Sequence, residues 1–450
     1  MKRALAVGCL VLLAAGSSWA MNTGLGGYVY WNTVHYSTPS TIRDYQLVER
    51  LYVSDLWAIG TRTTVDNVPD VNQADYLDYD GLNRNLEIFD PRHEGGTGDI
   101  LMVAHINHVP ASNVGLRDEP WDILRIDLGA DVDTPVITRQ ILCDGKIQPG
   151  NEATEWHTVN TRQVLKAPEG WGGRTTSGLS MVITRHLSQH TYHLFDTDGD
   201  GKIDNDTTEG SGSIHSGGDT GSAREYEFGP DDALYVSGRV PGYSDPAIRR
   251  VWMNGSATPT LETYYKPADP ARAFIDNITN VTGYMGLAIR PSTDCDVDAP
   301  IVYYGCRTTV AGVQRVSIVA FQDLDDDNVI TSADLMQIVW RNGMVGLDLG
   351  STYCDHSSSV GDIEWDPVSN SLFFNNSWGQ LYILALSDNG FLATDYVKGP
   401  GAVAPNPKVT STSGFELDMN PLVVPEPTTL LLVGTGLLAG LRGLRHRRRK

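Results

Sequence analysis

The sequence predicts an all-β fold made of repeated sheet units, and three observations support this prediction. Strand-like apolar runs end at turn residues that recur along the chain, at Gly60, Gly129, Gly201, Gly255, Asn328 and Gly390. The intervals between these positions are similar in length, which makes the pattern roughly periodic. The 46 Gly and 23 Pro, with β-branched and aromatic runs between them, favour many short strands. A sheet unit repeated at a roughly fixed period indicates a β-propeller.

The repeat is longer than the roughly 40–50 residues of a usual propeller blade, so we expect long loops. Four strands can be recognised in the unit at residues 224–265, as REYEF, ALYVSGR, AIRRVWM and LETYY, and again in the unit at 361–397. EFGPDDALYVSG and EWDPVSNSLFFNNS share one strand–turn–strand pattern. These units resemble the blades of six-bladed NHL or SMP-30-like propellers, which implies the same fold. Residues 21–423 show no linker, so we expect one propeller domain there.

Two separated segments are expected to share one sheet. Residues 413–420 (SGFELDMN) form a strand pattern without partners of its own, and the strands near residues 26–32 (GGYVYWN) lack a first strand. Pairing them would remove exposed strand edges, which invite aggregation. We therefore predict six blades. Seven blades stay open as an alternative, because residues 61–97 and 144–177 have no clear pattern.

The net charge of the 450-residue chain is −21. The two ends carry 8 of the 34 basic residues, so the body has 55 acidic against 26 basic residues, a formal charge of −29. This balance argues against a nucleic-acid partner, which needs a basic surface. Such an acidic surface attracts divalent cations instead.

Residues 1–20 are typical of a secretory signal peptide. Lys2 and Arg3 precede an apolar run, and Ser18-Trp19-Ala20 offers small residues at the positions that signal peptidase recognises. An N-terminal membrane anchor is the alternative, but the apolar run is short for a span.

One loop, at residues 196–206, has the spacing of a calcium site. Aspartates occupy positions 1, 3, 5 and 9, Gly201 lies at position 6, and Lys202 at position 7 is expected to offer its carbonyl oxygen. The predicted ligands are Asp196, Asp198, Asp200, Lys202 and Asp204. Thr207 stands where an EF-hand has glutamate. The loop resembles the calcium loops of integrin-type propeller blades, and the alternative is a solvated Asp-Gly turn.

A second loop repeats this spacing. Its predicted ligands are Asp323, Asp325, Asp327, Val329 through its carbonyl oxygen, and Asp334 at position 12. Asn328 takes the place of glycine at position 6, where asparagine tolerates a left-handed conformation. The loop resembles half of a dockerin, but a dockerin pairs two such loops closely and these two are far apart in the sequence, so cellulosome docking is not expected. We interpret Asp294, Asp296 and Asp298 as a surface turn, with a third calcium site as the alternative.

Four cysteines follow the predicted signal peptide: Cys143, Cys295, Cys306 and Cys354. An even number in an exported chain suggests disulfides. We expect a local bridge between Cys295 and Cys306, which leaves Cys143 and Cys354 as a second pair. No CxxC spacing is present, so a zinc site is not expected.

The C-terminal segment, residues 424–450, combines three features in order. Val424, Pro425, Glu426 and Pro427 precede an apolar stretch, predicted to form a transmembrane helix over about residues 428–444, and the chain ends in RHRRRK. This tail resembles the PEP-CTERM sorting signal. The resemblance implies recognition by an exosortase, removal of the tail, and delivery to the cell surface or exopolysaccharide matrix of a Gram-negative-type bacterium. An ordinary C-terminal anchor, with a tail that is never cut, is the alternative.

No HExxH, GxSxG or P-loop motif occurs. Glu155 with His157, and Asp355 with His356, are the pairs that could line a central pocket. We therefore expect an exported surface or matrix protein with structural calcium, which binds polysaccharide or another matrix protein without catalysis, or forms a passive scaffold. The alternative is a secreted propeller hydrolase, lyase or lactonase acting on carbohydrate or lactone. Acids and histidines at the centre of the ring would favour the enzyme; acids in outer hairpins would favour binding or scaffolding.

Overall fold

The computed structural model describes the strands and several connecting turns between residues 26 and 420. Its longest continuous described stretches are 225–239, 278–294, 297–331, 333–347, 360–376 and 381–398. The predicted signal peptide and sorting tail lie outside the described residues. Within the described part of the chain, no helix is long and apolar enough to cross a membrane.

The described residues are almost entirely β-strand. In the N-terminal half the strands are β1 (Gly26–Tyr36), β2 (Arg43–Val53), β3 (Thr63–Val68), β4 (Leu86–Asp90), β5 (Ile100–Ile106), β6 (Trp121–Asp127), β7 (Thr138–Cys143), β8 (Thr161–Lys166), β9 (Ser180–Arg185), β10 (Thr191–Phe195) and β11 (Gly210–His215). The remaining strands are β12 (Glu225–Phe228), β13 (Leu234–Arg239), β14 (Pro246–Trp252), β15 (Thr260–Tyr265), β16 (Ile278–Arg290), β17 (Ile301–Val310), β18 (Val313–Gln322), β19 (Leu335–Arg341), β20 (Val360–Asp366), β21 (Ser371–Asn376), β22 (Leu381–Leu386), β23 (Ala393–Lys398), β24 (Thr410–Ser411) and β25 (Phe415–Asn420).

These strands form six antiparallel sheets among the described residues. Five sheets are simple meanders of four consecutive strands: β4–β7, β8–β11, β12–β15, β16–β19 and β20–β23. The four strands predicted for residues 224–265 and for 361–397 are therefore confirmed, with closely matching boundaries. The two turns are closed by aspartates at different positions: Asp231 follows the proline and accepts the N–H of Ala233, whereas Asp366 precedes the proline and accepts the N–H groups of Val368 and Ser369.

The sixth sheet joins the two ends of the described chain. β25 pairs antiparallel with β1, from Gly26 opposite Asn420 to Trp31 opposite Phe415, and β2 and β3 continue the sheet on the other side. The predicted pairing of residues 413–420 with residues 26–32 is thus confirmed. Because the partners come from opposite ends of the described chain, this sheet forms only when the chain returns to its beginning.

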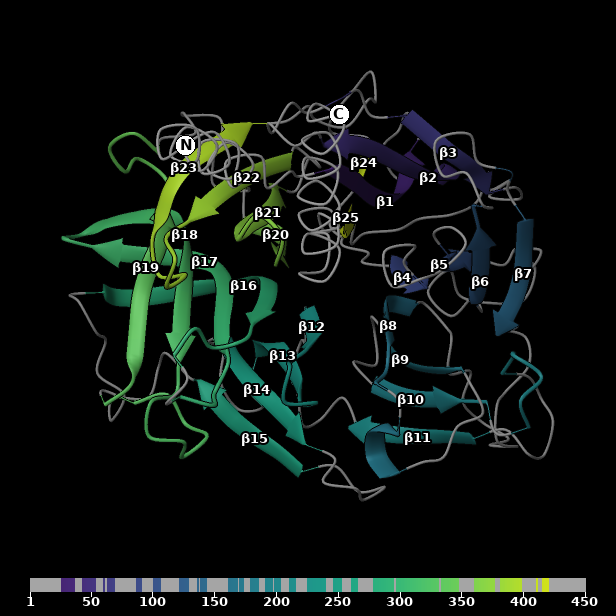
Figure 1. The fold of residues 1–450 in the computed structure, drawn as a ribbon, viewed down its shortest axis with the longest axis horizontal. Helices are drawn as coiled ribbons and strands as arrows, with labels where there is room; N and C mark the ends of the chain where they lie inside the picture. The colour runs from purple at the N-terminus through teal and green to yellow at the C-terminus, as the bar shows by residue number, and fades with distance from the viewer. Residues whose placement is uncertain are drawn as a thin grey trace, which may run out of the picture.

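The sheets are arranged around a common centre, as in a β-propeller (Figure 1). One strand of each sheet contacts its counterparts in the two neighbouring sheets, in the order β25, β4, β8, β12, β16, β20 and back to β25. The other strands of each sheet lie progressively farther from these inner strands.

Apolar layers between neighbouring sheets form the core. In β17, Ile301 and Tyr303 pack toward the sheet β20–β23, whereas Val302, Tyr304 and Cys306 pack toward the sheet β12–β15. Side chains alternate between the two faces of a strand, so a strand with neighbours on both faces is apolar throughout. This explains uninterrupted runs such as IVYYGC.

The predicted Cys295–Cys306 disulfide is wrong in this structure, because Cys306 is a free, buried thiol. Cys306 belongs to β17, and the alternation of the strand turns its side chain into the apolar layer against the sheet β12–β15. Burial raises the pKa of this thiol, since the charged thiolate loses its hydration. Cys295 and Cys354 lie outside the described residues, so the pairing of Cys143 with Cys354 stays a prediction.

Ile383 tests the packing between the last sheet and the sheet that joins the chain ends. It is fully buried with Val29, Trp31 and Leu51 of that sheet. Ile383→Ala is expected to lower the free energy of unfolding by about 2–5 kcal/mol, because it removes buried methyl groups and leaves a cavity. Urea unfolding measures this change. Val345→Ala, at a fully exposed site, is the control and should change stability by less than about 0.5 kcal/mol; equal midpoints for the two variants would contradict the packing.

Cys306 is expected to resist alkylation in the folded protein. At pH 8 its thiol is both buried and protonated, so iodoacetamide should modify it only after denaturation. Mass spectrometry of peptides from folded and urea-treated samples measures the modification. Recovery of a peptide that joins Cys295 to Cys306 from unreduced protein would show that the free thiol is wrong.

Candidate metal centres

Both aspartate loops occupy the same place in their sheets. The first follows β10 and precedes β11, and the second connects β18 to β19, so each lies between the third and fourth strands of a sheet. In both sheets these strands are remote from the inner strand that contacts neighbouring sheets. The two acidic clusters are therefore in outer turns rather than at the centre of the ring.

The first loop wraps around a buried carboxylate. Asp196 is fully buried, and its Oδ1 and Oδ2 accept hydrogen bonds from the N–H groups of Gly199 (2.6 Å) and Gly201 (2.9 Å). Both glycines have positive φ, 85° and 82°, which they adopt without a Cβ penalty. The chain can therefore turn its backbone N–H groups inward.

The exposed aspartates of the first loop lie close to the buried one. Asp198 accepts a hydrogen bond from the N–H of Asp200 (3.0 Å), and Asp200 accepts one from the N–H of Lys202 (2.8 Å). One carboxylate oxygen from each of Asp196, Asp198 and Asp200 lies within 4.8 Å of the others. Three negative charges at this separation repel one another and form a set of ligands for a hard cation.

The second loop has the same arrangement. Asp323 is buried and accepts a hydrogen bond through Oδ2 from the N–H of Asn328 (2.7 Å), and Asp327 accepts one from the N–H of Val329 (2.8 Å). Oxygens of Asp323, Asp325 and Asp327 lie within 4.8 Å of one another. Asn328 has φ of 64°, which confirms the left-handed conformation predicted for this position.

Asp323 is electrostatically unfavourable as a free carboxylate. Burial raises its pKa, the N–H of Asn328 opposes this, and the negative charges of Asp334 and Asp327 raise the pKa further. Because the pKa is higher in the folded than in the unfolded chain, the free energy of unfolding decreases as the pH rises from the unfolded to the folded pKa and the group ionises. The other oxygen, Oδ1, is buried without a hydrogen bond. The loop thus holds a buried carboxyl group with one oxygen that lacks a hydrogen bond.

Not every predicted ligand joins these clusters. Asp334 instead closes the second loop, where its Oδ1 accepts the N–H of Leu324 (2.8 Å) and its Oδ2 accepts the N–H of Thr331 (2.6 Å). Asp204 lies outside the described residues. Lys202 and Val329, predicted to offer carbonyl oxygens, are equivalent in the two loops, since each donates its N–H to the aspartate at position 5.

The other candidate sites add no chemistry within the described residues. Asp294 is exposed in a turn, where its carbonyl oxygen accepts the hydroxyl of Ser292 (3.0 Å), as predicted for a surface turn. His193 is buried in β10, where its Nε2 is hydrogen-bonded to Oγ of Ser180 (2.7 Å) and its ring packs against Trp171. The pairs Glu155 with His157 and Asp355 with His356 lie outside the described residues, as do Cys295 and Asp296.

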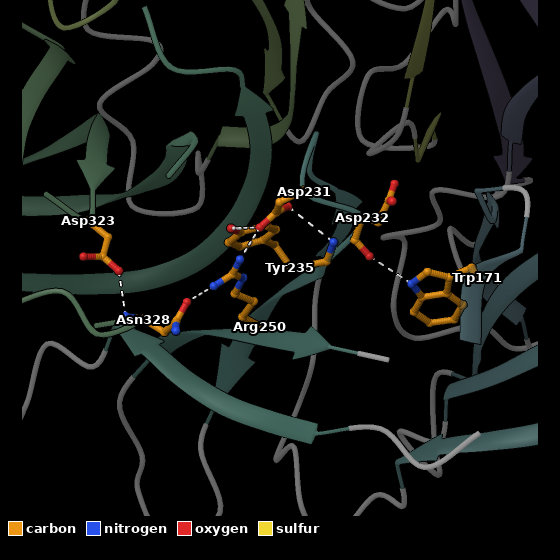
Figure 2. Close-up of polar contacts among 8 residues, drawn as sticks. Trp171, Asp231, Asp232, Tyr235, Arg250, Asp323 and Asn328 are labelled. Carbon is orange, nitrogen blue, oxygen red and sulfur yellow. Dashed lines mark hydrogen bonds and ion pairs between the residues drawn. The ribbon is translucent and has the colours of Figure 1, made fainter. Parts of the chain in front are cut away.

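A polar network beside the second loop was not predicted. Arg250 of β14 donates to Oδ1 of Asn328 and forms an ion pair with Asp231, whose Oδ2 also accepts the hydroxyl of Tyr235 (3.0 Å), as Figure 2 shows. Arg250 and Asn328 are 78 positions apart, so no local pattern marks the contact. The sequence does contain a weaker indication that these loops contact a neighbouring sheet, because both carry an apolar residue, isoleucine, at position 8 (Ile203 and Ile330).

Comparison with known families identifies the tail. Residues 423–449 match the PEP-CTERM protein-sorting motif, so the predicted sorting residues Val424, Pro425, Glu426 and Pro427 lie within a recognised sorting signal. The motif indicates export, processing by an exosortase and placement at the envelope or surface of a bacterium. No curated protein sequence matches the chain.

Several solved structures match much of the chain at low identity and low TM-score. The GH93 α-L-arabinofuranosidase of Fusarium graminearum is 10% identical, with a TM-score of 0.43 over 72% of this chain and 82% of that chain. The Dos1 propeller is 7% identical, with a TM-score of 0.35 over 71% and 63%, respectively. YCF48 from Cyanidioschyzon merolae is 12% identical, with a TM-score of 0.32 over 89% and 97%. The fold assignment rests on the sheets themselves, and any functional argument rests on the loops and the tail.

Proposed function

We propose that this chain is an exported protein of the bacterial surface or exopolysaccharide matrix, and that it binds or scaffolds matrix components without catalysis. In this proposal two calcium ions rigidify its outer turns. The observation that carries the proposal is the pair of three-aspartate clusters, each built on a buried carboxylate at the same place in its sheet. The sorting tail supplies the route to the surface.

Calcium fits the residues of both loops. Carboxylate oxygens are hard ligands, and Ca²⁺ accepts six to eight of them in a flexible geometry that an irregular loop can provide. Asp323 offers a buried oxygen without a hydrogen bond, and its pKa is raised. A divalent cation would neutralise this charge and the repulsion from Asp325 and Asp327. When bound, the ion supplies structural crosslinking; the loops themselves provide the ligands and hold them in place.

We further propose that the body is a closed propeller of six blades. Three facts support this number: the six described sheets, the unbroken order of contacts between their inner strands, and the pairing of β25 with β1. In such a ring every sheet packs between two neighbours, and the unpaired edge of each inner strand lies toward the centre. Residues 61–97, which left seven blades open, contribute β3 and β4 to two of these six sheets.

A binding or scaffolding role accounts for the acidic clusters better than an enzyme does. Within the described residues the aspartate clusters lie in outer turns, far from the inner strands where a propeller usually holds a small substrate. Most described aromatic side chains, such as Trp31 and Trp340, are buried between sheets, whereas Tyr52 is exposed and can stack on a sugar. Polysaccharide or another matrix protein is the proposed partner. Signal peptidase and an exosortase are the partners during export, and the tail alone contacts the membrane before processing.

Calcium titration tests this function. The full chain, kept in mild detergent, is expected to bind two calcium ions by calorimetry and to melt at a higher temperature in calcium than in chelator. At 100 times the Kd, each ion would add about 2.7 kcal/mol of stability. Asp198→Asn and Asp325→Asn should each abolish one binding event, because each removes one charged ligand.

Asp388→Asn is the matched control, since Asp388 is an exposed aspartate in the equivalent turn between β22 and β23. It should leave both binding events intact. If the wild-type chain gives no heat of binding and the same melting temperature in calcium and in chelator, the aspartate loops are ordinary turns and the calcium proposal is wrong.

Processing of the tail is tested in the native host. Replacing Pro425 and Pro427 together by alanine is expected to leave the tail uncut, because the rigid, extended proline pair that marks the signal is lost. The variant should then keep its full mass and remain in the membrane fraction. Pro421→Ala, just outside the matched region, should be processed like the wild type. If the wild-type chain also keeps its tail, the tail is a permanent anchor.

A further inference from the structure

Each aspartate loop inserts an isoleucine into the preceding sheet. Ile203, at position 8 of the first loop, is fully buried in a cluster with Ile123 and Leu142 of the sheet β4–β7. Its N–H also donates to the carbonyl oxygen of Leu142 (2.6 Å). Ile330, at position 8 of the second loop, is buried in a cluster with Ile248 of the sheet β12–β15. The loops therefore join adjacent sheets as well as adjacent strands.

The second loop has a polar anchor in addition. The guanidinium of Arg250, on β14, donates to the side-chain oxygen of Asn328 and is held from the other side by Asp231 (Figure 2). Tyr235 donates to the same carboxylate (3.0 Å) and its ring lies 5.8 Å from the guanidinium carbon of Arg250. Arg250 and Asp231 are mostly buried, with 13% and 16% of their side chains exposed. Such a pair is much less screened by salt than a surface pair.

The hydrogen bond from Arg250 is connected through Asn328 to the aspartate cluster of the second loop. The side-chain oxygen of Asn328 accepts a hydrogen bond from Arg250. The backbone N–H of Asn328 donates to Asp323 (2.7 Å), the buried carboxylate of the cluster. In the first loop Gly201 makes the same backbone hydrogen bond to Asp196 (2.9 Å), but glycine has no side chain for an arginine to hold. The two loops thus share their backbone frame and differ in this one contact with the preceding sheet.

We propose that Arg250 is a positioning residue for the second metal loop, and that a divalent cation bound there tightens the sheet β16–β19 against the sheet β12–β15. Arg250 fixes Asn328, Asn328 orients Asp323, and Asp323 holds the cation. By linkage, a cation that binds the docked loop more tightly than the undocked loop must strengthen docking to the same extent. The inference rests on the proposed calcium-binding function and adds to it a coupling between neighbouring sheets.

A double-mutant cycle tests the coupling. Arg250→Met removes the donors and keeps most of the side-chain stem, whereas Asn328→Gly keeps the positive φ and the backbone N–H but removes the acceptor. Calcium chloride is titrated calorimetrically into the full chain carrying Asp198→Asn, so that only the second loop binds. Each single change is expected to weaken binding about tenfold, within the usual range of coupling energies. The double variant should be no weaker than the weaker single variant, because both changes break one chain of contacts.

The first loop is the internal control. In the full chain carrying Asp325→Asn, neither Arg250→Met nor Asn328→Gly should alter the affinity of the first loop. Hydrogen exchange gives a second measurement: calcium should slow the exchange of amides in β14 of the wild type, and Arg250→Met should remove most of this effect. A purely structural role for Arg250 would weaken both loops alike or change the melting temperature alone.

Three results separate the inference from the proposed function. If the wild type binds two calcium ions and both single variants retain full affinity at the second loop, Arg250 has no positioning role and the inference is wrong. If the wild type binds no calcium, the proposed function fails and the inference fails with it. If Arg250→Met does not fold, Asn328→Gly decides, because it leaves the ion pair and packing of β14 in place; unchanged affinity of that variant would overturn the inference.

Discussion

Burial of both faces of every sheet is the constraint on which the rest of the structure depends. A four-stranded meander with two apolar faces is unstable alone and must pack between two neighbours. A row of such sheets ends with exposed apolar faces unless its first and last members meet. The layer formed by Val29, Trp31, Phe373 and Ile383 lies where the first and last sheets of the chain meet. This contact covers the last apolar faces, and the pairing of β25 with β1 gives the joining sheet strands from both chain ends.

The arrangement of sheets around a centre determines where charge can be placed. The layers between sheets are apolar, and both aspartate clusters lie on outer turns. The inner strands also carry carboxylates, among them the buried Glu225 of β12 and Asp362 of β20, so the acidic residues are not confined to the outer turns. In the two aspartate loops the backbone bends to offer N–H groups to one buried carboxylate, Asp196 or Asp323. Both oxygens of Asp196 accept such hydrogen bonds, whereas Oδ1 of Asp323 is buried without one, and this is the charge that the proposed cation would neutralise.

The two loops share one pattern of backbone hydrogen bonds but differ in how they contact the preceding sheet. Residues at positions 1, 5, 6 and 7 make equivalent backbone hydrogen bonds in both, and isoleucine at position 8 inserts into the preceding sheet in both. The second loop is also held by Arg250, a contact that the first cannot make because Gly201 occupies the place of Asn328. A single side chain at position 6 thus decides whether a loop is connected to the neighbouring sheet through this polar contact.

The sequence alone determined most of what depends on local chemistry. Strand and turn patterns predicted the four-stranded units, the spacing of aspartates predicted both clusters, and the order of proline, apolar and basic residues predicted the sorting tail. Only the tertiary structure decided which face of a strand a residue occupies and what lies opposite. Alternation along β17 turns Cys306 into an apolar layer, where its thiol is free. Asp334 closes its own loop instead of joining the cluster, a choice between two local contacts that the spacing did not reveal. Arg250 meets Asn328 because neighbouring sheets pack together, and contacts between sheets leave no spacing that a linear sequence can show.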